Sequence, residues 1–137
     1  MNIFLIDDDD LSRFLTQHTL LLEEAQLHIE TFPSAMEALG ALKAAGNEVP
    51  DIILLDLNMP VMDGWQLLEA LGPLMPRLLD RCRIYILTSS LDLADSERAK
   101  AYALVSGLIH KPLKSEDIEV IFSQYPTPGK GNPEKKK

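Results

Sequence analysis

The sequence has only one cysteine, Cys82, and no long apolar run. A single cysteine excludes a disulfide within the chain, and such sparse use of cysteine suits a reducing compartment. No apolar stretch approaches the roughly 20 residues that a membrane-spanning helix needs. The N-terminus also lacks the basic start of a signal peptide, because the acidic run Asp7–Asp10 follows almost at once. We therefore expect a cytoplasmic protein that neither crosses nor enters a membrane.

Basic residues are also scarce, with 13 lysines and arginines against 21 aspartates and glutamates. The formal net charge is −8, and four lysines with one glutamate follow Pro128. The chain before that point therefore carries 9 basic and 20 acidic side chains, a net charge of 9 − 20 = −11. A body this acidic argues against nucleic acid or an anionic membrane as the main partner.

Short apolar segments alternate along the chain with segments of helical spacing. The 137 residues, of which 46% are hydrophobic, are enough for one domain with a sizeable core. Strands are expected at residues 2–6, 27–32, 52–56, 83–87 and 105–110. Helices are expected at residues 11–22, 33–45, 65–71, 92–104 and 115–123. This alternation predicts an α/β protein with a parallel sheet and helices on both faces.

The helix expected at 11–22 and the segment from residue 126 onward differ in their content of apolar residues. In the helix at 11–22, apolar side chains (Leu11, Phe14, Leu15 and Leu22 among them) lie along one face, and Asp9 or Asp10 is a suitable N-cap. From residue 126 onward, PTPGKGNPEKKK offers no apolar side chain to bury. We expect residues 1–125 to form the domain and residues 126–137 to be a disordered tail.

The segment DIILLDLNMPVMDG, Asp51–Gly64, contains the residue on which the functional hypothesis depends. Its continuous apolar run predicts a strand buried on both faces, and this strand ends at Asp56. Open α/β folds place their chemistry at the carboxyl edge of the sheet. Pro60 and Gly64 then predict a tight turn. A strand-ending aspartate is often only a cap or turn residue, so Asp56 needs support from elsewhere in the chain.

That support comes from the ends of the other expected strands. The first strand is followed by Asp7 and Asp8, the fourth by Thr88 and the fifth by Lys111. Each of these signals is weak alone, since an acidic run is commonly a solvated surface and Thr88 is an ordinary cap. In a parallel sheet all carboxyl ends meet at one edge, so these side chains should converge with Asp56.

Their chemistry is complementary. Crowded carboxylates repel one another unless a cation lies among them, and ligands that offer only oxygen suit a hard ion such as Mg²⁺. An aspartate can act as a nucleophile and become an acyl phosphate. Lys111 would then neutralise one phosphoryl oxygen, and the Thr88 hydroxyl would donate to another. We therefore expect a site that accepts a phosphoryl group.

The chain resembles the receiver domain of two-component response regulators over roughly residues 2–125. The matching stretches are LIDDDD, DIILLDLNMPVMDG, ILTSS and HKPL. The resemblance implies a flavodoxin-like (βα)5 fold with a five-stranded parallel sheet in the order 2-1-3-4-5.

The resemblance also implies roles for individual residues. Asp56 would be the phosphoacceptor, with Lys111 pairing with the phosphoryl group and Thr88 turning toward it on activation. Asp7, Asp8 and Asp56 would hold Mg²⁺ together with the backbone carbonyl of Asn58. The bond between Lys111 and Pro112 would be cis, as is common in the family.

One departure from the family concerns how a signal leaves the site. The family often has an aromatic residue three positions before the lysine, coupled to the switch threonine, and this chain has Leu108 there. Tyr102 and Tyr85 do not stand at the matching position, and Tyr85 is interpreted as a sheet-packing residue. Ser89, where the family often has alanine, either lines the site or caps the next helix.

The resulting hypothesis is a phosphorylation switch and not a conventional enzyme. A sensor histidine kinase or a histidine phosphotransfer protein would donate the phosphoryl group, and a downstream protein would read a surface built from residues 92–125. Output through protein contact is expected because no recognisable effector segment follows. The alternatives are a phosphatase with an aspartyl nucleophile, which generally needs an acid where this chain has Asn58, and a receiver-like module that is never phosphorylated.

Overall fold

The computed structural model describes residues 1–46 and 48–123, so the expected tail at 126–137 lies outside the described residues. The strands are β1 (Asn2–Ile6), β2 (His28–Phe32), β3 (Ile52–Asp56), β4 (Arg83–Thr88) and β5 (Val105–His110). The helices are α1 (Asp10–Glu23), α2 (Ala35–Ala45), α3 (Gly64–Ala70), the 3₁₀ turn η1 (Gly72–Leu74), α4 (Met75–Leu78), α5 (Leu93–Ala99) and α6 (Ser115–Ser123). The chain after α3 thus continues through a 3₁₀ turn and a second short helix, neither of which is among the expected helices.

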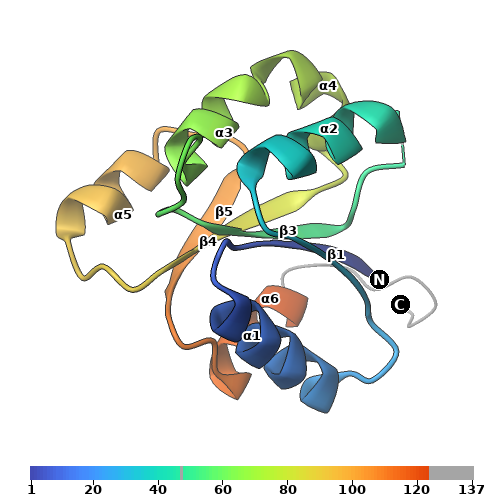
Figure 1. Ribbon diagram of the computed structural model, residues 1–137, viewed down its shortest axis with the longest axis vertical. Coiled ribbons are helices and arrows are strands. Elements are labelled where there is room, and N and C mark those ends of the chain that lie inside the picture. Colours follow the sequence, from blue (N-terminus) through green and yellow to red (C-terminus); the bar gives the residue numbers. More distant parts are fainter. Residues whose placement is uncertain (47, 124–137) are drawn as a thin grey trace.

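The five strands form one parallel sheet in the order β2-β1-β3-β4-β5, as predicted. All five residues of β3 are buried, which explains its continuous apolar sequence. Strand β2 lies at the edge, and its residues are either exposed or half-buried. In Figure 1 all strands run from the side of the N-terminus toward the side of α5, so their carboxyl ends meet at that edge.

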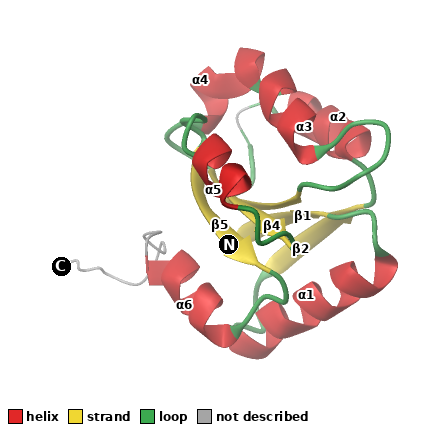
Figure 2. Cartoon of the chain, turned by 90° about the vertical axis from the view of Figure 1, so that its left-hand side faces the viewer, coloured by secondary structure: helices red, strands yellow, loops and turns green. Residues whose placement is uncertain are grey.

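Helices cover both faces of the sheet (Figures 1 and 2). Helices α2, α3 and α4 lie on one face with α5 beside them, while α1 and α6 lie on the other. Each face has its own apolar core: Ile6, Leu42 and Leu67 belong to the first, and Leu5 and Leu54 to the second. The flavodoxin-like fold expected from the sequence is confirmed.

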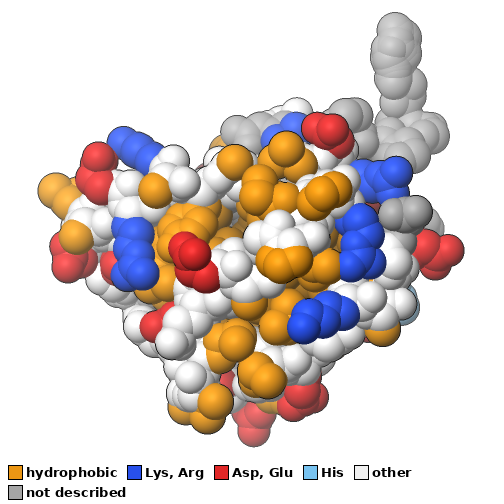
Figure 3. All heavy atoms as spheres, turned by 90° about the horizontal axis from the view of Figure 1, so that it is seen from above, with side chains coloured by type: hydrophobic (Ala, Val, Ile, Leu, Met, Phe, Trp, Pro, Cys, Tyr) orange, Lys and Arg blue, Asp and Glu red, His pale blue; other side chains and the backbone are white. Residues whose placement is uncertain are grey.

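The face formed by α2, α3 and α4 is viewed from outside in Figure 3. Hydrophobic side chains gather over its middle, and charged side chains lie mostly around them. Met36 and Leu79, each about half exposed at 54% and 49%, are among the apolar residues that reach the surface. Within residues 1–46 and 48–123, every helix is too short or too polar to cross a bilayer.

Helix α1 is oriented differently from what its apolar residues suggest. Thr16 and Leu20 are its buried residues, whereas Leu11, Phe14 and Leu22 are 63–72% exposed. The rotation of the helix is fixed at its start, where the Asp9 side chain caps it and the Ser12 hydroxyl bonds to a carboxylate at the end of β1. Residues 12, 16 and 20 share one stripe of the helix, so that stripe faces the sheet and the leucine-rich stripe faces outward.

Helix α5 is shorter than expected. The predicted helix at 92–104 is capped by Asp92, begins at Leu93 and already ends at Ala99. The N–H groups of Lys100, Ala101 and Tyr102 bond to carbonyls three residues earlier. This tighter winding ends the α-helix, although the alanine-rich sequence favours its continuation.

Candidate functional site

The carboxyl ends of β1 and β3 bring three carboxylates together. Asp7, Asp8 and Asp56 each offer an oxygen atom, and these atoms lie within 4.8 Å of one another. Asp7 and Asp56 are buried, with 0% and 5% of their surfaces exposed, while Asp8 is exposed. Adjacent parallel strands pair Ile6 with Leu55, so the residues that follow them emerge side by side. The convergence inferred from the sequence is confirmed for these three carboxylates.

Asp7 is held by donors on both of its carboxylate oxygens. The backbone N–H of Asp9 donates to Oδ1 at 3.0 Å. The Ser12 hydroxyl and the Lys111 ammonium donate to Oδ2 at 2.5 and 2.9 Å. The Arg13 side chain donates to the Asp7 carbonyl at 2.7 Å. Ser12 and Arg13 were missed in the sequence, because only the rotation of α1 turns them toward β1.

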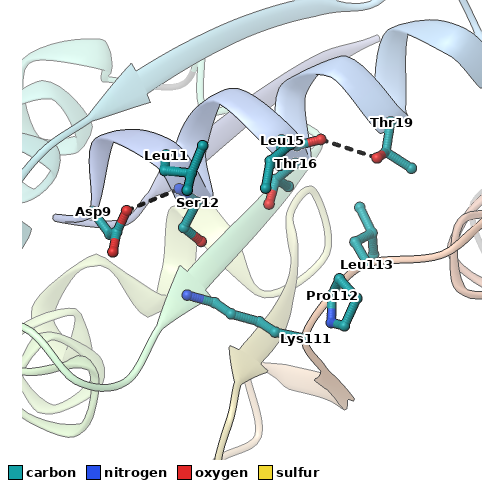
Figure 4. A pocket seen from close by; sticks show the side chains of 9 residues that line it. All are labelled: Asp9, Leu11, Ser12, Leu15, Thr16, Thr19, Lys111, Pro112 and Leu113. Atoms are coloured by element: carbon teal, nitrogen blue, oxygen red, sulfur yellow. Dashed lines mark hydrogen bonds between the residues drawn. The ribbon is translucent and has the colours of Figure 1, made fainter.

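Lys111 reaches this cluster from the loop after β5. Figure 4 shows its side chain extended toward the first turn of α1, with Pro112 and Leu113 below the helix. Its Nζ atom lies 2.9 Å from Asp7 Oδ2 and 3.4 Å from Asp56 Oδ1. Its backbone N–H donates to the Thr88 carbonyl at 2.8 Å, which fixes the loop against β4. The peptide bond to Pro112 is cis, as the resemblance implied.

The charges in the cluster shift one another's protonation. Burial raises the pKa of Asp56 from 3.8 to about 6, the positive charge of Lys111 counteracts this rise, and the negative charge of Asp7 adds to it. Burial alone would lower the pKa of Lys111, but its hydrogen bond to Asp7 and the charge of Asp56 raise it overall. Lys111 therefore stays charged while Asp56 retains a basic, poorly solvated carboxylate.

Thr88 ends β4 and is fully buried. Its hydroxyl oxygen accepts a hydrogen bond from the Ser90 N–H at 3.0 Å. This bond connects Thr88 to the segment that leads into α5. Asp92 caps α5, so the interpretation of the neighbouring Ser89 as the cap is wrong; Ser89 is exposed. Leu108 on β5 is partly buried against the core below α5, and Tyr85 packs in the sheet as expected.

The loop after Asp56 is held tightly. The Gly64 N–H donates to the Leu57 carbonyl at 2.9 Å, and a Cβ atom at Gly64 would lie 2.9 Å from the Asp56 carbonyl oxygen. Asp63 and Gln66 form a reciprocal capping box at the start of α3. Val61 has φ of 70°, a conformation that a β-branched residue rarely adopts. Such local strain is commonly found beside functional sites.

The donor set fits a hard divalent cation. The three clustered side chains offer only carboxylate oxygens, which Mg²⁺ prefers, and the exposed Asp8 leaves one side open to solvent. Oδ1 of Asp7 accepts one hydrogen bond and retains an acceptor site, whereas Oδ2 already accepts two. Whether the carbonyl of Asn58 also contributes stays a prediction. The cluster thus combines two buried carboxylates, one exposed carboxylate and the ammonium of Lys111.

Comparisons with known proteins agree on one family. Residues 3–122 match the family model described as the response regulator receiver domain. A response regulator receiver protein from Dyadobacter fermentans is 30% identical, with a TM-score of 0.81 over 90% of this chain and 96% of that chain. The chemotaxis protein CheY4 of Vibrio cholerae is 26% identical, with a TM-score of 0.72 over 91% of this chain and 98% of that chain.

Curated relatives are longer proteins. The two-component response regulator ARR10 of Arabidopsis thaliana is 36% identical over 72 residues, which are 53% of this chain and 12% of that protein. Protein-glutamate methylesterase/protein-glutamine glutaminase 3 of Hahella chejuensis is 31% identical over 99 residues, 72% of this chain and 26% of that protein. The chain therefore spans only about an eighth to a quarter of these relatives.

Proposed function

The chain belongs to the response regulator receiver domain family, and from that premise we propose that it is a signalling switch phosphorylated on Asp56. Membership identifies it as a receiver of two-component signalling and not as a classical enzyme. The phosphodonor would be the histidine of a sensor kinase or of a histidine phosphotransfer protein. The receiver domain would occupy residues 1–125.

The observation that carries this proposal is the position of Lys111. Its ammonium lies 2.9 Å from Asp7 and 3.4 Å from Asp56, so one cation serves two buried carboxylates. A phosphoryl group added to Asp56 would place new negative oxygens beside the same ammonium. Because Ser12 also donates to Asp7 Oδ2, that carboxylate keeps a donor when Lys111 turns toward the phosphoryl group.

The transfer itself needs only one bond made and one broken. An oxygen of the Asp56 carboxylate attacks phosphorus, and the bond between phosphorus and the donor histidine nitrogen breaks, leaving that nitrogen with the electron pair. Asp7 and Asp8, with Asp56 and the carbonyl of Asn58, would hold Mg²⁺, which supplies charge neutralisation for the transferring group. Lys111 and Thr88 would then bind separate phosphoryl oxygens.

The outward stripe of α1 is a suitable docking surface for the phosphodonor. Leu11, Phe14 and Leu15 are 50–65% exposed. Leu11 and Leu15 line a pocket of about 340 Å³ (Figure 4). Lys111 and Asp9 also line that pocket, so a protein bound there would lie next to the carboxylate cluster. Apolar side chains gathered near a polar site are typical of interfaces.

Intact-mass measurement after incubation with Mg²⁺ and acetyl phosphate, a small phosphodonor, tests the proposal. Wild-type protein should gain the mass of one phosphoryl group, and Asp56→Asn should gain none, because the amide cannot form the acyl phosphate. Asp51→Asn is the matched control, since Asp51 precedes the same strand at the opposite edge of the sheet. It should gain the same mass as wild type. Equal labelling of Asp56→Asn and wild type would refute Asp56 as the acceptor.

A further inference from the structure

Helix α5 is weakly packed against the rest of the molecule. Ala99 is the buried residue among its seven, and Leu93 at its start is 80% exposed. Figure 1 shows α5 projecting beside the carboxyl edge of the sheet. An element with so few buried apolar contacts moves at low free-energy cost. Its position therefore depends on the contacts made at its two ends.

The first end is connected to Thr88 by successive hydrogen bonds. The Thr88 hydroxyl accepts from the Ser90 N–H at 3.0 Å, and the Ser90 hydroxyl accepts from the Asp92 N–H at 3.1 Å. Asp92 Oδ1 then accepts from the Ala94 N–H at 2.9 Å. A turn of the Thr88 side chain moves the first acceptor of this series. The start of α5 is thus connected to Thr88 through these hydrogen bonds.

The second end is held by four side chains that we call the clamp: Trp65, Glu69, Arg98 and Tyr102. The Arg98 guanidinium lies 4.5 Å from the centre of the Trp65 ring, a cation–π contact. The Trp65 and Tyr102 rings stack with centroids 5.8 Å apart. The Tyr102 hydroxyl donates to Glu69 Oε2 at 2.8 Å, a charge-assisted bond. Within each pair, Trp65 with Glu69 and Arg98 with Tyr102, the residues are four apart.

The clamp joins the segment after Asp56 to the segment after Thr88. Trp65 follows Gly64, whose N–H donates to the Leu57 carbonyl and where an added Cβ atom would lie 2.9 Å from the Asp56 carbonyl oxygen. The α3 side of the clamp is therefore fixed to the backbone of the phosphoacceptor, and Trp65 is only 7% exposed. Arg98 and Tyr102, by contrast, belong to α5 and the turn after it.

We propose that the clamp sets the resting position of α5 and couples α5 to the phosphorylation of Asp56. Two states differ in their contacts: α5 held by the clamp while Thr88 is bonded to Ser90, and α5 released when Thr88 turns toward a phosphoryl group. Leu108 offers no ring for this purpose, so the aromatic contact comes from Trp65 and Tyr102. This inference rests on the proposed function and adds the route by which α5 responds.

Hydrogen–deuterium exchange of the unphosphorylated protein tests the resting contact. Tyr102→Phe removes the hydroxyl and retains the stacked ring, and Glu69→Gln weakens the same bond from its other side. Each should speed exchange of the α5 amides about fivefold, the effect of losing one hydrogen bond of ordinary net strength. The double variant should add little to either. Lys100→Gln, which removes the exposed pair of α5 with Glu97, is the matched control and should leave exchange unchanged.

Emission of Trp65, the single tryptophan of the chain, tests the coupling. With Mg²⁺ and acetyl phosphate, wild-type protein should gain phosphoryl mass, change its Trp65 emission and exchange α5 amides faster. Tyr102→Phe should gain the same mass with a smaller change in emission.

Three results overturn the inference, and they are distinguishable. Resting exchange equal in wild type and both clamp variants shows that the clamp does not hold α5. A gain of phosphoryl mass without any change in Trp65 emission or α5 exchange refutes the coupling and leaves phosphorylation standing. Absence of a mass gain in wild type contradicts the proposed function, and the coupling falls with it.

Discussion

Asp56 and Lys111 form a pair in which burial and charge act in opposite directions. Burial favours the neutral acid and raises the pKa of Asp56 to about 6, while Lys111 favours the carboxylate. The carboxylate is thus kept at a cost in stability, since a fold optimised for stability alone would not bury it. A nucleophile that is poorly solvated is also a more reactive one.

The raised pKa of Asp56 predicts how its removal changes stability with pH. In the folded protein Asp56 binds a proton up to about pH 6, and in the unfolded chain only up to about 3.8. Stabilisation from the protonated group is therefore fully present below pH 3.8 and is lost as pH rises through 6. With EDTA present, Asp56→Asn should be more stable than wild type at pH 7, by on the order of 1–3 kcal/mol.

Urea unfolding across pH 4–7 measures this difference. The gap between variant and wild type should narrow steadily toward pH 4. A gap that is constant over the whole range would show that the charge of Asp56 does not cost stability.

In helix α1, the apolar pattern of the sequence and the hydrogen bonds of the site favour different orientations of the helix. The first turn of α1 donates Ser12 and Arg13 to Asp7, and this fixes which stripe of the helix faces the sheet. The leucine-rich stripe is then left at the surface. An apolar stripe kept exposed beside a reactive site is consistent with a surface that binds another protein.

Two leucines on opposite stripes of α1 test this orientation. Leu20 is 1% exposed, and Leu20→Ala should lower the free energy of unfolding by about 2–4 kcal/mol through a cavity in the core. Leu15 is 50% exposed, and Leu15→Ala should change it by no more than about 0.5 kcal/mol. Chemical denaturation of both variants gives the comparison. Equal losses, or a larger loss for Leu15→Ala, would mean that α1 is rotated otherwise.

At the scale of the whole molecule, the parallel sheet concentrates acidic charge at one edge. The chain carries a net charge of −8, and three of its carboxylates lie within 4.8 Å of one another. Any added cation screens the general repulsion, whereas a bound divalent ion acts only at the cluster. The two effects are separable because removing one charge of the cluster hardly alters the net charge of the chain.

The effect of adding and removing Mg²⁺ on the stability of the whole protein follows from this. At ten times its dissociation constant, Mg²⁺ should stabilise the fold by about 1.4 kcal/mol and raise Tm by about 5 °C. EDTA should reverse the shift, and NaCl of equal ionic strength should produce much less. Asp8→Asn should lose most of the Mg²⁺-specific part. Thermal melting measures these changes. An equal rise of Tm in Asp8→Asn and wild type would argue against ion binding at this cluster.

The sequence by itself determined the strands, their parallel direction and the residues at their carboxyl ends, while the order of the strands came from the resemblance to receiver domains. Strands buried on both faces require continuous apolar runs, and the residue after each run is placed at the sheet edge by the fold geometry alone. For this reason Asp7, Asp56 and Lys111 were identified before their distances were known. Asp8 followed from the same argument.

Only the tertiary structure decided the rotation of α1, the early end of α5 and the contact between Tyr102 and Glu69. These two residues are 33 positions apart, and their hydrogen bond forms because α3 and the turn after α5 lie side by side. Helix propensity and apolar spacing describe a segment in isolation, so they do not register a bond to a distant partner. Contacts between distant segments fixed the details that local patterns left open.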